Sequence, residues 1–220
     1  MGARKLLILL ATVATVAGGL VIGRAISKSG PSSSPPMIQG SATLDTLPRR
    51  IIDPTPAHDA ARWMTSLTHD QHPSVVVFWD FTCPISREYF LEVVPNLADV
   101  SIGFAHLPLL GPGAGLDAAV AAECAGLFGR FWEFARIAFE HQSELEELEW
   151  TEMAQRAGIA DLEEFLACLS EEAPIDRVFA GWRAAHRIGV IGTPAVLVGD
   201  LYFPYPPRTH RLIEVVDGQR

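Results

Sequence analysis

The chain has 220 residues, 49% of them hydrophobic, which is enough to bury the core of one sizeable domain with an additional segment attached. A formal net charge of −9, without a long basic stripe or a glycine-rich phosphate loop, excludes nucleic acid as a main partner. Seven scattered histidines and three cysteines without metal-ligand spacing predict neither a metal site nor a cofactor.

The N-terminus begins with an uncharged, apolar run over residues 6–23, which Arg4 and Lys5 precede and Arg24 follows. A run of about 18 residues is just long enough to span a bilayer. It predicts an uncleaved signal-anchor, although small residues near Ala17 also suit a cleaved signal peptide. Both alternatives place the following chain outside the cytoplasm, either anchored in the cell envelope or secreted or periplasmic after cleavage.

Three regions follow from this pattern. We predict the N-terminal signal-anchor or signal peptide over 1–27, a linker rich in serine and proline over 28–50, and a folded domain over 51–220. The N-terminal segment would make the membrane a partner of the chain.

The first half of the domain alternates helices and strands. We expect a short helix within 57–67, a buried strand within 73–79, a turn up to Cys83, a helix from Pro84 to about 96, and a second strand within 99–109. The strand within 73–79 is continuously apolar and rich in valine, which is typical of a strand buried on both faces.

The second half begins with a helical insertion, expected at about 112–188, and ends with a hairpin. Aromatic and alanine residues at helical spacing over 131–139 indicate one apolar helix face. Further helices are expected at 150–157, 161–170 and 174–187, then a hairpin over 193–203 and a helix over 208–216. This order predicts an α/β fold with an inserted helical subdomain.

Cys83 stands between the first strand and the next helix. Pro84 suits the first position of a helix, so Cys83 is expected at the N-cap, where backbone N–H groups and the helix dipole favour a thiolate. Ser86, one turn later, could donate a hydrogen bond to that sulfur but cannot attack a mixed disulfide. The alternative is that Cys83 is an ordinary buried thiol.

A second feature is the Thr193-Pro194 dipeptide before the hairpin. Because proline cannot donate a ladder hydrogen bond, it is expected at the start or edge of a strand. A cis bond here would turn the chain and present backbone groups to a neighbour, whereas a trans bond would be a common strand start.

Together, the stretches FWDFTCPIS, AAECAGLFGRFWEFARIAFEHQ, FLACL and IGVIGTPAVLVGD resemble the DsbA-like branch of the thioredoxin superfamily over about residues 55–216. The resemblance implies a thioredoxin-like fold with a helical insertion and an extracytoplasmic thiol–disulfide exchange site. It places the nucleophile at Cys83, the cis-proline at Pro194 with Thr193 facing the sulfur, and a common acidic residue at Asp80.

Ser86 departs from this family, which usually has Cys-x-x-Cys. Exchange proceeds through a mixed disulfide, and without a second cysteine an external thiol must resolve it. The chain is therefore predicted to be a thiol–disulfide oxidoreductase with a single nucleophilic cysteine. Its partners would be protein thiols or disulfides in the cell envelope and an external resolving thiol or redox partner.

Two other functions stay open. One is a redox-inactive thioredoxin-fold protein that binds peptides or acts like a chaperone. The other, ranked lower, is a peroxiredoxin-like peroxidase, a family that expects threonine where this chain has Asp80.

The remaining site residues have more than one interpretation. Cys124 and Cys168 could form a structural disulfide in an oxidising compartment or stay as buried thiols, and Cys124 could resolve a mixed disulfide on Cys83. Asp80 could be a buried proton acceptor or an exposed acid at the strand end. Three aromatic residues could line a groove beside Cys83, although core packing is favoured for at least two of them: Trp79, Phe81 and Tyr89.

Overall fold

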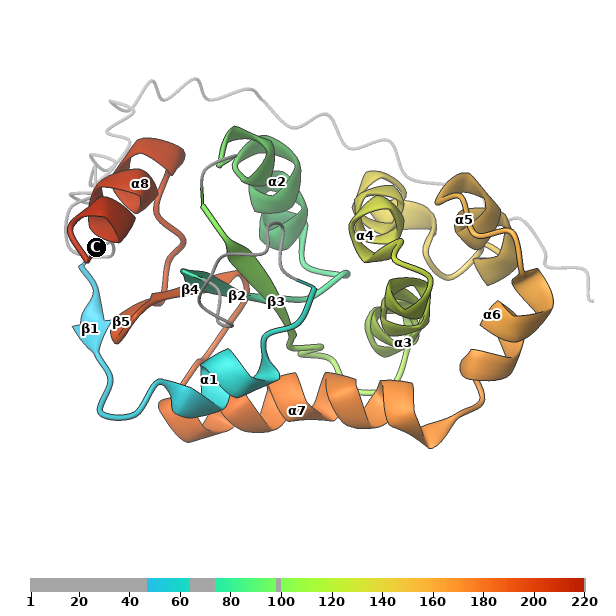
Figure 1. Cartoon of the computed structure of the whole chain (residues 1–220), viewed down its shortest axis with the longest axis horizontal. Coiled ribbons are helices and arrows are strands. Elements are labelled where there is room, and N and C mark those ends of the chain that lie inside the picture. Colours follow the sequence, from blue (N-terminus) through green and yellow to red (C-terminus); the bar gives the residue numbers. More distant parts are fainter. Residues whose placement is uncertain (1–46, 64–73, 98–99, 220) are drawn as a thin grey trace, which may run out of the picture. The chain divides into compact units, whose positions relative to one another are not determined.

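A computed structural model describes residues 47–63, 74–97 and 100–219 of the chain. Helices cover both faces of a five-stranded sheet, and a block of further helices lies beside it (Figure 1). This arrangement confirms the α/β fold with an inserted helical subdomain. The predicted segment 1–27 and nearly all of the linker lie outside the described residues, and within the described ranges no helix is long and apolar enough to span a bilayer.

The sheet has the strand order β1-β5-β4-β2-β3. Interior strand β2 is parallel to β3 and antiparallel to β4, and all five of its residues are buried, as its apolar run predicted. Arg49 and Arg50, which the sequence placed in the linker, instead form edge strand β1 and pair with β5. The strands are β1 (Arg49–Arg50), β2 (Val75–Trp79), β3 (Ile102–His106), β4 (Ala195–Val198) and β5 (Leu201–Phe203).

The helices follow the predicted order with three differences. The first is shorter than expected and ends at Ala60, the helix after Cys83 gives way to a 3₁₀ turn, η1 (Val94–Asn96), and Gly129, with φ of 68°, separates α3 from α4. The helices are α1 (Thr55–Ala60), α2 (Pro84–Glu92), α3 (Ala114–Leu127), α4 (Phe131–Glu140), α5 (Trp150–Arg156), α6 (Leu162–Cys168), α7 (Glu172–Ile188) and α8 (Thr209–Asp217).

Side chains of β2 alternate between two hydrophobic clusters, because successive residues of a strand point to opposite faces. Val75, Val77 and Trp79 pack with α2, α8 and much of the insertion. Val76 and Phe78 pack with α1 and α7 on the other face. Figure 1 shows the same division, with α2 and α8 on one side of the sheet and α1 and α7 on the other.

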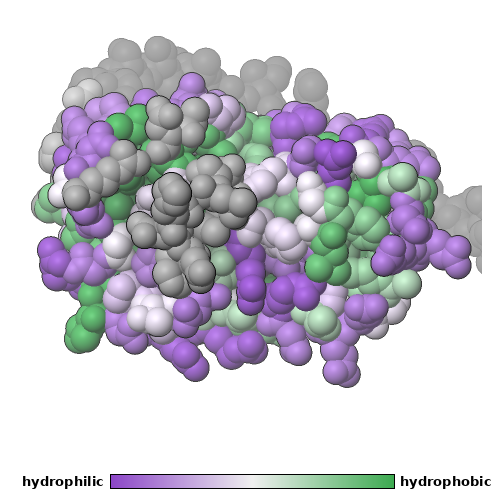
Figure 2. All heavy atoms as spheres, viewed as in Figure 1, coloured by the Kyte–Doolittle hydropathy of each residue, from purple (hydrophilic) through white to green (hydrophobic). Residues whose placement is uncertain are grey.

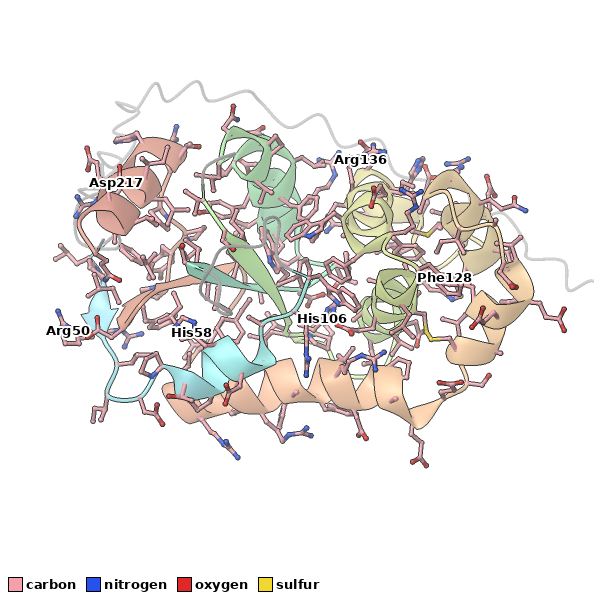
Figure 3. The ribbon with its side chains drawn as sticks, in the orientation of Figure 1. Arg50, His58, His106, Phe128, Arg136 and Asp217 are labelled. Carbon is pink, nitrogen blue, oxygen red and sulfur yellow. A yellow bond between two sulfur atoms is a disulfide. The ribbon has the colours of Figure 1, made fainter. Side chains whose placement is uncertain are left out.

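The insertion, α3 to α7 with the 3₁₀ turn η2 (Gln142–Glu144), lies between β3 and β4 in the chain. A disulfide joins Cys124 of α3 to Cys168 of α6, with their Cα atoms 5.9 Å apart (yellow in Figure 3). Hydrophilic residues dominate the visible surface over α5, α6 and α7 (Figure 2). The insertion is therefore a helical subdomain that a disulfide cross-links internally and that exposes mainly hydrophilic residues on the visible face.

Candidate active site

The sulfur of Cys83 lies at the start of α2, in the position that the sequence predicted. Cys83 is the N-cap residue, with extended backbone (φ −82°, ψ 117°), and Pro84 occupies the first helical turn. The cysteine is half-buried, and it is the one free thiol among the described residues. Its Sγ lies 3.2 Å from the carbonyl oxygen of Thr193 and donates a hydrogen bond to it.

Thr193 reaches Cys83 because β4 pairs with β2. Ala195, the first residue of β4, lies opposite Phe78, so the residues before it lie beside the turn that follows β2. The Thr193–Pro194 peptide bond is cis, and the Thr193 carbonyl rather than its hydroxyl faces the sulfur. The Thr193 Oγ1 atom is buried without a hydrogen-bond partner.

Ser86 does not make the expected contact with the sulfur. Its side chain is fully buried, and its hydroxyl oxygen accepts a long hydrogen bond, 3.5 Å, from the backbone N–H of Asp80. The reason is geometric: the side chain of Ser86 points inward beneath the turn, whereas Cys83 is half exposed. Ser86 therefore packs against the end of β2, and the described hydrogen bonds give it no role toward the Cys83 sulfur.

Asp80 is buried, with 3% of its surface exposed, so the structure places it inside the protein rather than at an exposed strand end. Its Oδ1 accepts hydrogen bonds from the backbone N–H and the hydroxyl of Thr82, at 2.8 and 2.7 Å, and its Oδ2 accepts one from Leu109 N–H at 2.9 Å. A Cβ at Gly115 would come within 2.9 Å of Oδ1. Asp80 thus ties the Cys83 turn to the segment after β3 and to the start of α3.

Gln142 is a site residue that the sequence analysis missed. Its side-chain amide donates hydrogen bonds to the carbonyls of Phe81, at 2.7 Å, and Cys83, at 3.0 Å. Arg87 of α2 makes a similar link, since its Nε donates to the carbonyl of Phe139 at 2.8 Å. Both bonds join residues more than 50 positions apart, so no local signal in the sequence could have revealed them.

The three aromatic residues that could have lined a groove beside Cys83 all pack into the core, and Tyr89 also lines a groove between α2 and the start of α8. Trp79 and Phe81 are almost completely buried, and Trp79 stacks on Phe104 with ring centroids 5.4 Å apart. Tyr89 is also buried, and its hydroxyl donates a hydrogen bond to the Pro207 carbonyl at 2.9 Å. Burial raises the pKa of the Tyr89 phenol above its ordinary value.

A buried charge cluster lies next to the turn, at the end of β3. Glu123 of α3 has a fully buried side chain and accepts hydrogen bonds from Trp63 at 3.0 Å, His106 at 2.9 Å and Arg177 at 2.7 Å. Burial by itself would raise the pKa of Glu123, but the hydrogen bond and charge of His106, followed by the bonds from Arg177 and Trp63, bring it below the ordinary value. Figure 3 labels His106 between the sheet and α7.

The cluster also fixes the insertion to the sheet, because its four residues come from the segment after α1, from β3, from α3 and from α7. The ring of Phe81, in the turn before Cys83, lies 6.1 Å from the His106 ring, measured between centroids. The turn that contains Cys83 therefore packs, through Phe81, against the His106 side of the buried cluster around Glu123.

The comparisons with known proteins agree with the fold. The family model described as Thioredoxin matches residues 69–217. Two curated relatives are Na(+)/H(+) antiporters NhaA: one from Mycolicibacterium vanbaalenii, 29% identical over 91% of this chain and 32% of its own length, and one from Salinispora tropica, 32% identical over 57% of this chain and 20% of its own. The chain thus spans about a third or less of these antiporters.

Three solved structures share the architecture. BdbD from Bacillus subtilis has a TM-score of 0.63 at 18% identity, covering 80% of this chain and 98% of that one. A thioredoxin-like oxidoreductase from Silicibacter pomeroyi has a TM-score of 0.60 at 21% identity, covering 76% and 98%. The thiol-disulfide exchange protein alpha-DsbA2 from Wolbachia pipientis has a TM-score of 0.60 at 21% identity, covering 70% and 86%. At these identities the likeness establishes the fold, which is DsbA-like.

Proposed function

The chain belongs to the thioredoxin family, and from this premise we propose that it catalyses thiol–disulfide exchange with Cys83 as its single nucleophile. The observation that carries the proposal is the position of the sulfur. It is half exposed, so a substrate disulfide can reach it, and it lies at the N-cap of α2 next to the residue before the cis-proline. Exchange begins when the thiolate form of such a sulfur attacks a disulfide.

The proposed reaction has two balanced steps. The Cys83 thiolate attacks a substrate disulfide, forms an S–S bond with one sulfur and releases the other as a thiolate. An external thiolate then attacks the substrate sulfur of the mixed disulfide, and Cys83 leaves as a thiolate. One substrate sulfur is thereby released as a thiolate, the other becomes disulfide-bonded to the external thiol, and the protein returns to its starting state.

The resolving thiol has to come from outside the chain because position 86 carries a buried serine and the other cysteines are engaged. Cys124 and Cys168 form a disulfide, and both are buried. A disulfide in a domain of this size also supports an oxidising compartment, so we place the domain on the extracytoplasmic side, in the cell envelope or beyond it.

Mixed-disulfide trapping tests this proposal. The full chain is incubated with a glutathionylated peptide, and the mass of the protein and the position of the adduct are determined by mass spectrometry. We expect an adduct on Cys83 that persists until glutathione is added, and no adduct on the Cys83→Ser variant. A wild-type protein that forms no adduct, or one whose adduct lies on Cys124 or Cys168, would contradict the proposal.

The Ser86→Cys variant provides the matched comparison. It places a second thiol one helical turn from Cys83, so its adduct should be released without added glutathione and at a rate independent of protein concentration. If the adduct on this variant is as persistent as on the wild type, position 86 does not control resolution.

Peptide binding without chemistry is the alternative function, and one contact favours it. The Cys83 thiol donates its hydrogen to the Thr193 carbonyl, so the sulfur is already engaged in the free protein. A binding protein would retain its client affinity and its activity in cells when Cys83 is replaced by alanine. Loss of both in the Cys83→Ala variant would support exchange instead.

A further inference from the structure

A groove in the helical insertion has no part in the proposed chemistry. It lies between α3, α5, α6 and α7 and has a volume of about 440 Å³. Five half-buried apolar side chains line it: Leu116, Val120, Trp150, Leu169 and Ile175. They offer a continuous hydrophobic surface contributed by all four helices or by the residues next to them.

The rim of this insertion groove is acidic. Asp117, Glu171 and Glu172 line it and are exposed, and no basic residue is among its lining residues. Across the described part of the chain, the ion pairs include none of these three carboxylates. The groove therefore combines apolar lining residues with three carboxylates that have no basic residue beside them among the lining residues.

The disulfide joins two of the elements that carry lining residues of the groove. Val120 lies one helical turn before Cys124 on α3, and Leu169 directly follows Cys168 at the end of α6. The S–S bond thus links the two walls to which these apolar residues belong. A surface with fixed walls loses less conformational entropy when it binds a partner.

The start of α3, the helix that contributes Leu116 and Asp117 to the groove, packs against the Cys83 turn. Leu116 and Asp117 follow Gly115, whose Cα approaches the Asp80 carboxylate and Thr82 so closely that a Cβ there would lie 2.9 Å from Asp80 Oδ1 and 3.2 Å from Thr82 Cγ2.

From these observations we infer that the insertion groove binds a cationic amphipathic segment of a client protein. Apolar side chains of that segment would cover Leu116, Val120 and Leu169, and lysine or arginine residues at its edge would pair with Asp117, Glu171 and Glu172. The Trp150 indole offers a face for a further cation. The inference rests on the proposed function and deepens it by naming the kind of client that the domain holds.

Fluorescence anisotropy of a labelled peptide tests the inference separately from the chemistry. The probe is a cysteine-free amphipathic peptide of leucine and lysine, and its leucine–glutamate counterpart is the control. Because no thiol is present, the result stands whether or not Cys83 performs exchange. The full chain should bind the lysine peptide and not the glutamate peptide, and affinity should fall as salt is raised.

Two triple variants with equal loss of charge locate the site. Asp117→Asn, Glu171→Gln and Glu172→Gln together should weaken binding of the lysine peptide roughly tenfold or more, since three exposed ion pairs are lost. Asp59→Asn, Glu88→Gln and Glu163→Gln together should leave it within about twofold, because these acids lie outside the groove. A peptide with a photoreactive group should crosslink to the stretch that contains Leu116 or Trp150.

Several results would overturn the inference. Equal weakening in both triple variants would mean that net charge alone attracts the probe. Binding of the glutamate peptide with equal affinity would mean nonspecific apolar adhesion. A full chain that does not bind the lysine peptide would reject a client site here, and this result is also expected if another segment of the chain fills the groove. Crosslinks confined to α2 or α8 would reject it as well.

Discussion

Replacing Glu123 with glutamine should destabilise the domain strongly, because this carboxylate is fully buried and accepts hydrogen bonds from three different elements. Trp63, His106 and Arg177 all donate to it, over distances of 2.7 to 3.0 Å. Glutamine has nearly the same shape, so the Glu123→Gln variant tests charge and hydrogen bonding rather than packing.

The expected magnitude follows from counting donors. A glutamine side chain has one acceptor oxygen in place of two, and its NH₂ group must face one of the three donors. Leaving one buried donor unsatisfied costs about 1–3 kcal/mol, and the hydrogen bond with Arg177 also loses its charge assistance. The side chain of Arg177 is only 22% exposed, so water compensates for little of this. We expect a loss of roughly 2–4 kcal/mol in the free energy of unfolding.

Urea unfolding at neutral pH measures this loss, with Glu140→Gln as the matched control. Glu140 pairs with Arg136 at 2.6 Å on the surface of α4, and both side chains are about half exposed. Removing that charge should cost under about 0.5 kcal/mol. The Glu123→Gln midpoint should fall by about 1–2 M urea. Equal midpoints for the two variants would refute the argument that the buried cluster holds the insertion to the sheet.

Three further predictions follow from the same structure. Since the folded-state pKa of Glu123 is lowered, the stability it contributes is complete above the usual glutamate pKa of about 4.3 and is lost as pH falls through the lower folded value; Glu123→Gln should therefore flatten the acid side of a stability–pH curve. Burial raises the pKa of Tyr89, so stability present below about pH 10 is lost above it. Tyr89→Phe should remove one phenol that ionises above the usual range from an ultraviolet pH titration, and it should cost about 1 kcal/mol through the lost bond to Pro207. The Cys124→Ala/Cys168→Ala double variant opens a loop with a sequence separation of 44 and should lose roughly 2–4 kcal/mol in urea unfolding; an unchanged midpoint would show that the disulfide constrains nothing.

Interactions between distant residues were the part that the sequence could not predict. The turn carbonyls of Phe81 and Cys83 accept from Gln142, which lies about 60 positions away, and nothing near Gln142 distinguishes it from any other polar residue at the end of a helix. The cluster around Glu123 is hidden for the same reason, because a glutamate within an alanine-rich helix could equally face solvent. Tertiary packing alone brings its three donors together.

Ser86 shows how the same limit affects the candidate site. Helical spacing correctly placed it one turn after the N-cap, but spacing does not determine how far a small side chain lies beneath the surface. In the structure Ser86 is fully buried and its oxygen accepts from the Asp80 N–H, and the hydrogen bonds of the described residues include none from Ser86 to the Cys83 sulfur. Asp80 is a parallel case: the sequence left it either buried or exposed, and the loop after β3 decided this by covering it with Leu109.

Local pattern was sufficient where the structure depends on local physics. The continuous valine run made β2 a strand buried on both faces, and Pro84 after Cys83 set the start of α2, because both depend on backbone preferences and burial within a few residues. The sequence by itself therefore determined the fold, the helix start at Cys83 and the lack of a second thiol at position 86. Only the tertiary structure decided which carbonyl faces the sulfur, which carboxylates are buried and where an acidic apolar groove forms, since each requires side chains from elements far apart in the chain to meet.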